Sequence, residues 1–215
     1  MLCKYPIYLE QANGLVRCNR CLHCRINARM KKTGRLVLES KFYDPRKILF
    51  VTLTYSQPHL PTFWSCSYTG QVFTHNDGTL YPLHLEKFWK RLRKRFPPKS
   101  IRYFACGEYG DKNMRPHYHA VIWGIDYNSR HHIYDCWSDP NTFDPYCDPA
   151  RLDVQIPKSE WDVAQYCCSY ILKKMTKDTD ERLEYRYPEF FRSSQGIGLS
   201  AIDDIVQSYH SPNGS

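Results

Sequence analysis

The sequence predicts an α+β fold in which helices pack on one face of a mostly antiparallel sheet. Two observations predict this class. Several short stretches rich in β-branched and aromatic residues, bounded by turn residues, are typical of strands. Longer stretches between them carry apolar residues at helical spacing. The chain has 215 residues, which is enough for one domain with small additions and a sizeable core.

The first half of the chain carries the strongest helix and strand signals. Asp44-Pro45 should end a helix, and the segment KILFVTLTY after it is β-branched and aromatic. Five apolar residues between Pro82 and Phe96 follow the i, i+3, i+4 rule, and Pro97-Pro98 should end that helix. The expected elements are an irregular arm at 1–20, a helix at 24–43, a strand at 47–55, a long loop holding a hairpin at 56–81 and a helix at 82–96.

The second half predicts a hairpin followed by shorter elements. Two apolar strands flank the segment from Gly107 to Pro116, which we interpret as the turn of an antiparallel pair. The expected elements are strands at 100–106 and 117–123, a short helix at 129–137, a loop at 138–150, a strand at 151–156 and a helix from Ser159 or Glu160 to about Lys174. We expect three units, namely an N-terminal arm and helix at 1–44, a central domain at 45–177 and a C-terminal tail at 178–215.

The formal net charge of +8 favours a polyanionic partner. Eight basic residues between Leu85 and Arg102 are opposed by one acid, Glu86, so this stretch alone carries a local charge of +7. We expect this helix face to neutralise nucleic-acid phosphates, although a merely solvated face is the alternative. The residues expected there are Lys87, Lys90, Arg91, Arg93, Lys94 and Arg95.

The cysteines point to thiol or metal chemistry. Neither a secretory signal nor a run of 18 apolar residues is visible, so we expect a reducing cytoplasm and no membrane. Ten cysteines in that compartment argue against a disulfide framework. Cys18, Cys21 and Cys24 are candidate ligands of a structural Zn²⁺, with Cys3 or Cys106 as the fourth ligand. An iron–sulfur cluster and three plain reduced thiols are the alternatives.

The segment Arg115-Pro-His-Tyr-His is the most informative one for chemistry. On a strand, His117 and His119 share one face and Tyr118 points to the other. Glu108, on the neighbouring strand, can add a carboxylate. Two histidines and one acid leave room on a divalent ion for a phosphate oxygen, and the mixed ligands suit Mn²⁺ somewhat better than Mg²⁺. Ordinary histidines beside a solvated acid are the alternative.

A second pattern lies on the helix expected to end near Lys174. Tyr166 and Tyr170 are four residues apart and share one helical face, which Lys173 and Lys174 can extend. A phenol is a weak nucleophile at neutral pH, and a nearby ammonium group favours its ionised form or stabilises charge at phosphorus. We expect Tyr166, Tyr170, Lys173 and Lys174 to be catalytic. Core packing or base stacking by the two tyrosines is the alternative.

Taken together, these segments resemble the HUH endonucleases, and above all the replication initiators of microviruses, the gokushovirus-type single-stranded DNA phages. The motifs that carry the resemblance are Phe50-Val-Thr-Leu-Thr-Tyr55, Glu108 with His117-Tyr118-His119, and the Tyr166/Tyr170 pair. Smaller segments also resemble these initiators, including Cys18, Cys21 and Cys24-Arg25 near the start and Gln195-Gly-Ile-Gly198 near the end. Cys167-Cys168, between the tyrosines, departs from the small or β-branched residues expected there.

The resemblance implies a ferredoxin-like HUH endonuclease core and a rolling-circle replication initiator. Such an enzyme nicks and joins single-stranded phage DNA at a replication origin through a 5′-phosphotyrosine intermediate, using Mn²⁺ or Mg²⁺. No nucleoside-triphosphate loop is visible, so a helicase and a polymerase of the bacterial host are the expected partners. The alternatives are an HUH transposase or relaxase, and a non-catalytic ferredoxin-like nucleic-acid-binding module.

Overall fold

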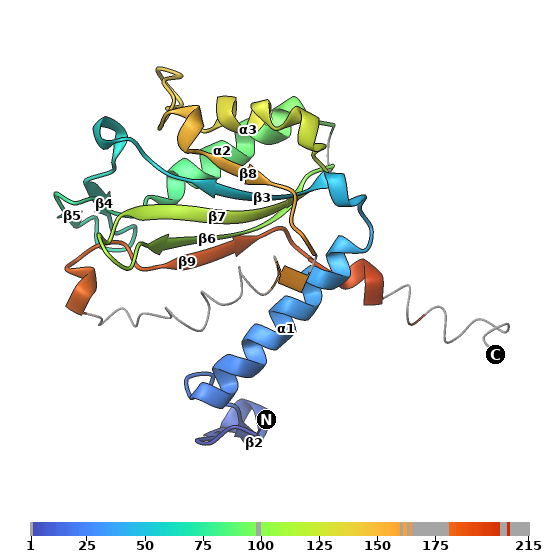
Figure 1. Cartoon of the computed structure of the whole chain (residues 1–215). Helices are drawn as coiled ribbons and strands as arrows, with labels where there is room; N and C mark the ends of the chain where they lie inside the picture. The colour runs from blue at the N-terminus through green and yellow to red at the C-terminus, as the bar shows by residue number, and fades with distance from the viewer. Residues whose placement is uncertain are drawn as a thin grey trace, which may run out of the picture.

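The computed structural model describes residues 2–97, 100–159, 161–162, 164, 181–202 and 206. Its centre is a five-stranded sheet in which every neighbouring pair is antiparallel (Figure 1). In spatial order the strands are β8 (Asp153–Gln155), β3 (Ile48–Leu53), β7 (Pro116–Trp123), β6 (Arg102–Tyr109) and β9 (Phe190–Ser193). The predicted α+β class with a mostly antiparallel sheet is confirmed.

The strand β7 occupies the middle of the sheet and holds it together. It pairs with β3 along Ile48–Leu53 and with β6 along its whole length. Pairing on both edges satisfies the backbone groups of this buried strand. Its side chains alternate between the two faces, so the sheet has two separate apolar clusters.

Helices α2 (Pro82–Arg95) and α3 (His131–Cys136) cover one face of the sheet (Figure 1). The predicted apolar stripe of α2 is confirmed, since its four central apolar residues are buried. The larger cluster lies between these helices and the sheet and includes Tyr118, Ala120 and Ile122 of β7. A long helix is thus placed on the sheet by a stripe that its sequence displays.

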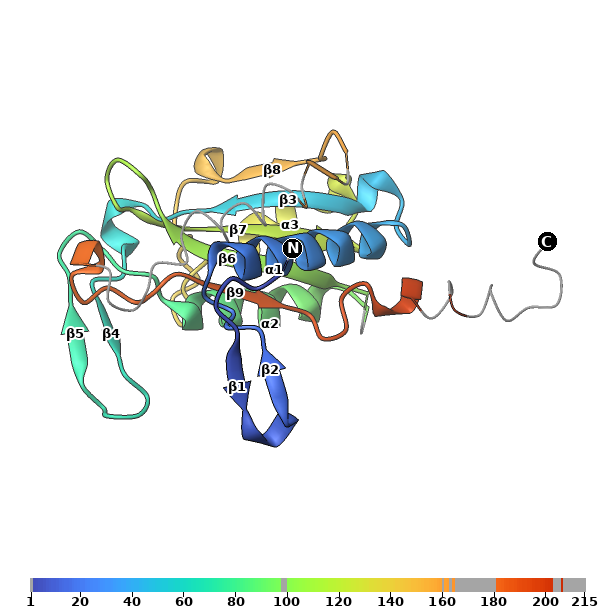
Figure 2. The same ribbon diagram turned by 90° about the horizontal axis from the view of Figure 1, so that it is seen from below.

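Helix α1 (Leu22–Ser40) lies on the opposite face, below the sheet in Figure 1 and in front of it in Figure 2. Leu36 of α1 packs with Val121 and Trp123 of β7, and the indole Nε1–H of Trp123 donates to the Ser40 hydroxyl at 2.9 Å. The helices therefore cover both faces of the sheet, and the prediction of a single covered face is wrong. Because β7 is apolar on both sides, both faces need a cover.

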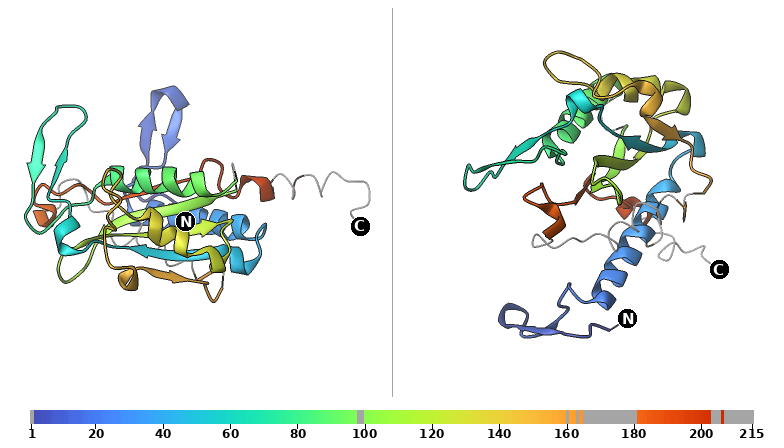
Figure 3. Two further views of the ribbon diagram at one scale, coloured as in Figure 1. Left: turned by 90° about the horizontal axis from the view of Figure 1, so that it is seen from above. Right: turned by 60° about the vertical axis from the view of Figure 1, so that its left-hand side comes forward.

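Two short hairpins project from the main body (Figures 2 and 3). One pairs β1 (Ile7–Leu9) with β2 (Gly14–Val16), within a stretch expected to be irregular. The other pairs β4 (Phe63–Ser65) with β5 (Val72–Thr74) and confirms the hairpin expected in the long loop. Short 3₁₀ turns lie at Glu10–Ala12, Pro45–Lys47, Gln57–His59, Tyr127–Ser129, Pro149–Arg151 and Glu181–Leu183.

The sheet extends further than predicted at two places. The strand β6 continues to Tyr109, because Glu108 and Tyr109 still pair with β7, so the turn is only Gly110–Arg115. The strand β9 lies in the segment expected to be a tail, and it pairs with β6 at the edge of the sheet. Among the described residues, no helix has the length and apolar character needed to cross a membrane.

Candidate metal centre

Three strands bring the predicted metal ligands to the α1 face of the sheet. Glu108 on β6 lies directly opposite His117 on β7, and Thr52 on β3 lies directly opposite His119. Residues two apart on a strand share a face, so both histidines project together, on the same side as Val121 and Trp123. Two expectations are confirmed here: the histidines share a face, and the acid comes from the neighbouring strand.

The two imidazoles converge on a single carboxylate oxygen. The Nε2 atom of His117 lies 2.7 Å from Oε1 of Glu108, and the Nε2 atom of His119 lies 3.0 Å from the same oxygen. One ligand atom from each of the three residues lies within 4.8 Å of the other two. This is the arrangement of a two-histidine, one-carboxylate group that can hold a divalent ion.

The other nitrogen of each ring is held by a neighbouring group. His117 Nδ1 lies 3.0 Å from the Arg115 carbonyl, to which it can donate, and His119 Nδ1 lies 3.0 Å from the Thr52 hydroxyl. Phe50 stacks on the His119 ring, with centroids 5.6 Å apart. Partners of this kind orient metal-ligating histidines, because they fix both the tautomer and the plane of the ring.

Electrostatics favour a cation beside Glu108. Burial alone would raise the pKa of this carboxyl, but hydrogen bonds from His117 and His119 outweigh it and hold the pKa below the ordinary value. The other oxygen, Oε2, is buried and accepts no hydrogen bond from any described residue. A buried, ionised oxygen without a partner is costly. A positive ion at this position would offset that cost.

The distances also fit a shared ion. Two ligands at right angles on an ion with bonds of about 2.1 Å lie about 3.0 Å apart. The two separations between the ring nitrogens and Glu108 Oε1, 2.7 and 3.0 Å, are close to this value. The donor set of two nitrogens and one oxygen suits Mn²⁺ and also admits Mg²⁺. Glu108, His117 and His119 therefore fit the ion that the sequence motif implies.

Tyr118, between the two histidines, serves the opposite face. It is fully buried, and its hydroxyl accepts from the Tyr81 backbone N–H at 2.9 Å and lies 3.1 Å from the Tyr55 hydroxyl. Burial raises the pKa of Tyr118 above its ordinary value. The middle residue of the motif is thus a core side chain that holds β7 against the α2 side.

The expected catalytic residues Tyr166, Tyr170, Lys173 and Lys174 lie outside the described residues. The described positions just before them are informative. Residues 161, 162 and 164 are helical, and the Ser159 hydroxyl accepts from the Asp162 N–H at 3.0 Å, as a helix-capping residue does. Ala164 is buried in the cluster that also contains Leu36 and Val121. Ala164 therefore lies on the face of the sheet that carries the histidines.

The basic residues of α2 lie on the other side of the sheet from the candidate metal centre. Most of them are exposed, and Lys90 forms an ion pair of 2.6 Å with Glu86. Arg91 is partly buried and donates to the carbonyls of Cys136 and Ser138, at 2.8 and 2.5 Å from Nη2. Arg91 thus links α2 to α3, and phosphate binding by the remaining α2 residues stays a prediction.

A second basic helix escaped the sequence analysis. Helix α1 carries five basic residues and no acid between Arg25 and Arg35, and it lies on the face of the sheet that carries Glu108 and the histidines. Arg25, Arg29 and Lys32 are spaced by four and three residues and so form one stripe. Counting charges along residues 22–40 would have found this run, but sequence alone could not assign it to the face with the histidines.

The fold and this centre define a class: an α+β protein with a two-histidine, one-carboxylate candidate metal centre on a central antiparallel sheet. Residues 48–179 match the family of the replication-associated protein ORF2. The match covers more than half of the chain, and the chain belongs to this family. Both the sheet residues of the centre and the tyrosine segment lie within the matched range.

Several proteins of microvirus-type phages are similar to this chain. The replication-associated protein ORF2 of Spiroplasma virus 4 is 32% identical over 197 residues, which are 87% of this chain and 57% of that protein. The replication-associated protein VP4 of Bdellovibrio phage phiMH2K is 26% identical over 215 residues, or 96% of this chain and 65% of that protein. The resemblance to phage replication proteins that the motifs indicated is confirmed.

The replication-associated protein ORF4 of Chlamydia phage 1 is 27% identical over 218 residues, which are 94% of this chain and 49% of that protein. The chain therefore spans between about half and two thirds of the length of these curated relatives. No solved structure matches the chain.

Proposed function

We propose that this chain is a rolling-circle replication initiator that nicks and rejoins single-stranded phage DNA at a replication origin. The observation that carries the proposal is the convergence of His117 and His119 on one oxygen of Glu108, at 2.7 and 3.0 Å. Membership of a family of replication-associated proteins supports DNA as the substrate. A centre of this composition on such a protein is suited to phosphodiester chemistry.

Glu108, His117 and His119 would hold Mn²⁺ or Mg²⁺. When bound, such an ion supplies positive charge at a phosphate oxygen and so lowers the barrier to attack at phosphorus. Thr52 and the Arg115 carbonyl keep the two Nε2 atoms directed at one point, so little reorganisation is needed when DNA arrives. Helix α1 closes the same side of the sheet and brings Arg25, Arg29 and Lys32 toward a DNA backbone.

The nucleophile would be Tyr166 or Tyr170. Its phenol loses a proton and its oxygen bonds to phosphorus, the bond between phosphorus and the 3′ oxygen breaks, and the 3′ oxygen takes up a proton. One phosphodiester is exchanged for another, so the reverse reaction rejoins the strand without ATP. Lys173 or Lys174 would stabilise the charge that develops on the phosphate. Burial of Ala164 on the histidine side supports this assignment, because Tyr166 is only two residues further along.

A covalent-adduct assay tests this function. Single-stranded oligonucleotides that tile the encoding phage genome, each labelled at the 3′ end, are incubated with the full chain and Mn²⁺. Labelled protein on a denaturing gel is the expected result with one or a few of them. The double variant Tyr166→Phe/Tyr170→Phe should form no adduct, because no phenol remains to carry the strand, and His117→Ala/His119→Ala should form none because the ion is lost.

Matched controls separate chemistry from folding. Tyr185→Phe removes an exposed phenol, and His132→Ala removes a histidine on the α2 side of the sheet; both should keep the adduct. Oligonucleotide binding without any adduct would instead indicate a non-catalytic nucleic-acid-binding module. Adduct formation by the double tyrosine variant would refute the assignment of the nucleophiles.

A further inference from the structure

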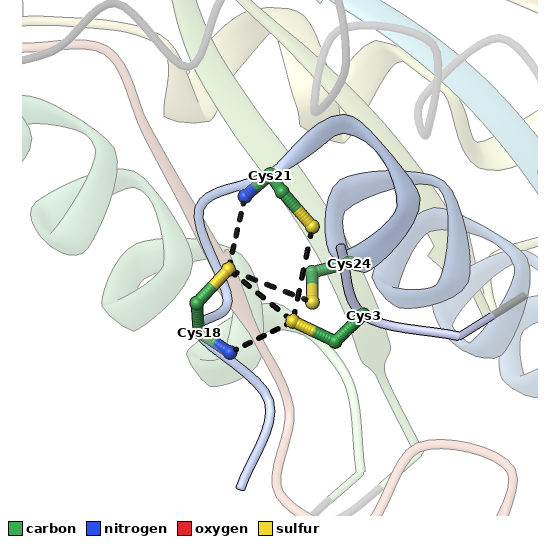
Figure 4. Close-up of side chains that lie close together, drawn as sticks. All are labelled: Cys3, Cys18, Cys21 and Cys24. Atoms are coloured by element: carbon green, nitrogen blue, oxygen red, sulfur yellow. Dashed lines mark hydrogen bonds between the residues drawn. The ribbon is translucent and has the colours of Figure 1, made fainter. Parts of the chain in front are cut away.

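Four cysteine side chains lie together at the N-terminal end of α1 (Figure 4). Their sulfur atoms lie within 4.8 Å of one another, and they belong to Cys3, Cys18, Cys21 and Cys24. The Sγ atom of Cys3 lies 3.5 Å from that of Cys18 and 4.0 Å from that of Cys21. Three of these residues are close in sequence, whereas Cys3 is separated from them by the β1–β2 hairpin.

These separations match one tetrahedral ion. With Zn–S bonds of about 2.3 Å, the four sulfurs of a tetrahedral site lie about 3.8 Å apart. The separations of 3.5 and 4.0 Å bracket that value, and Cys18 to Cys24 is also 4.0 Å. They are too long for a disulfide, whose sulfurs lie about 2.0 Å apart. A cluster with a different iron behind each sulfur would need the sulfurs further apart than a single ion does.

The backbone around the sulfurs also suits thiolates. The Cys18 N–H donates to Cys3 Sγ at 3.3 Å, and the Cys21 N–H donates to Cys18 Sγ at 3.3 Å. Cys21 directly precedes the first residue of α1, so the cluster lies at the N-terminal end of this helix. Amide donors and the positive end of a helix both stabilise the negative charge that metal-bound sulfur carries.

The turn between Cys18 and Cys21 depends on one backbone position. Asn19 has φ of 57°, in the left-handed region that asparagine tolerates better than most residues. The tight turn brings both sulfurs to the same side of the chain, as two ligands of one ion require. Cys24 follows one helical turn later and is buried. The local backbone is therefore shaped to bring three thiols together before Cys3 is added.

The segment that these cysteines anchor has no core of its own. Between residues 2 and 20 no side chain is buried, and only Cys3, Gly14, Val16 and Cys18 are even partly covered. A hairpin of two three-residue strands is not stable alone in water. The hairpin nevertheless projects from α1 as a defined element (Figure 2). A strong link at its base is needed to hold it there, because small units without a core depend on metals or cross-links.

We propose that Cys3, Cys18, Cys21 and Cys24 bind one structural Zn²⁺ that fastens the N-terminal hairpin to α1. Four protein ligands close the coordination sphere, so the ion is structural and has no position open for substrate. Cys3 is the fourth ligand of the predicted trio. Cys106, the other candidate, lies in β6, where its Sγ contacts the His119 carbonyl at 3.7 Å. The sulfur site is separate from the centre formed by Glu108 and the two histidines.

Metal analysis of the full-length protein tests the proposal. Purified, dialysed protein should contain one zinc per chain by mass spectrometry of its metals, and the variant His117→Ala/His119→Ala should keep that zinc. Cys3→Ser should lose most of it, whereas Cys66→Ser, which changes a free cysteine in the β4–β5 hairpin, should lose none. Replacement by Co²⁺ should give the visible absorption of a tetrahedral thiolate site.

A second readout does not depend on metal content. Removal of zinc by a chelator should expose residues 2–20 to trypsin at Lys4, Arg17 and Arg20, while the sheet stays protected. Cys21→Ser should behave like the chelated protein, with a lower melting temperature, and should still form the DNA adduct if the chain nicks DNA. Iron in place of zinc, protein without metal, or full zinc content in Cys3→Ser would overturn the proposal.

Discussion

The Thr52 hydroxyl on β3 lies 3.0 Å from Nδ1 of His119 on β7, so an uncharged side chain orients one of the candidate metal ligands. Thr52→Val keeps the shape and removes this hydrogen bond. Loss of such a partner typically lowers metal affinity by about 10–100-fold. We expect Mn²⁺ affinity, measured by calorimetric titration, to fall within that range. Thr74→Val, in the β4–β5 hairpin, should leave it unchanged, and equal affinities in the two variants would contradict an orienting role for Thr52.

Tyr118 should matter for stability and not for metal binding. Its hydroxyl accepts from the Tyr81 N–H at 2.9 Å and donates to the Tyr81 carbonyl at 3.2 Å, in a fully buried site. Tyr118→Phe leaves these groups without their partner, which should cost about 1–3 kcal/mol in the free energy of unfolding. Urea unfolding measures this loss. Mn²⁺ affinity should stay the same, because the ring points away from His117 and His119; a large drop in affinity would show that the two faces are coupled.

Acid should destabilise the fold through His84. Its ring stacks on Tyr146, and burial lowers the pKa of His84 to about 4, with a smaller opposing effect from Asp139. The unfolded chain takes up this proton near pH 6.5, whereas the folded chain does so only near 4, so protonation favours unfolding between these values. The resulting loss of stability between pH 6.5 and 4 should be on the order of 2–3 kcal/mol.

Comparison of two proteins isolates this effect. His84→Asn should unfold with a shallower pH dependence than the parent chain over the same range, because asparagine does not titrate. Urea midpoints at a series of pH values give the two slopes. Parallel slopes would show that His84 is not the group responsible for acid sensitivity.

Gly198 should be intolerant of any side chain. It has φ of 68°, its N–H donates to Glu39 at 2.7 Å, and an added Cβ would overlap the Arg35 carbonyl. Gly198→Ala should therefore lower the free energy of unfolding by about 2 kcal/mol or more. Gly34→Ala, in α1 with nothing near its Cβ, should instead add up to about 1 kcal/mol. Thermal melts of both variants check these opposite signs, and a stable Gly198→Ala would contradict the close approach.

The two basic helices should contribute unequally to DNA binding. Arg29 and Lys32 belong to α1, on the sheet face that carries Glu108 and the histidines, whereas Lys87 and Lys94 belong to α2, on the other face. Replacing either pair by glutamine removes two charges. Each lost phosphate contact should reduce the salt-dependence slope for single-stranded DNA by about 0.7. We expect the reduction in the α1 variant; fluorescence anisotropy over a salt series would measure it, and a larger effect in the α2 variant would reverse the assignment.

Local patterns were enough to predict much of the fold and of the site. The i, i+3, i+4 stripe of Pro82–Phe96 and the apolar run after Asp44-Pro45 predicted α2 and β3 because these patterns depend on residues close in sequence. The two-residue period of a strand predicted that His117 and His119 share a face and that Tyr118 does not. The strand β9 and the β1–β2 hairpin were missed, since three or four residues show too little of a repeating pattern.

The amino-acid order alone thus indicated the class of fold, the paired histidines and their acid. Only the tertiary structure placed Cys3 beside Cys18, joined Gly198 to Glu39 and brought α1, with its basic residues, to the histidine side of the sheet. These are contacts between residues distant in the chain. Strand order and helix placement decide such contacts, because both depend on how the whole core packs and not on any local repeat.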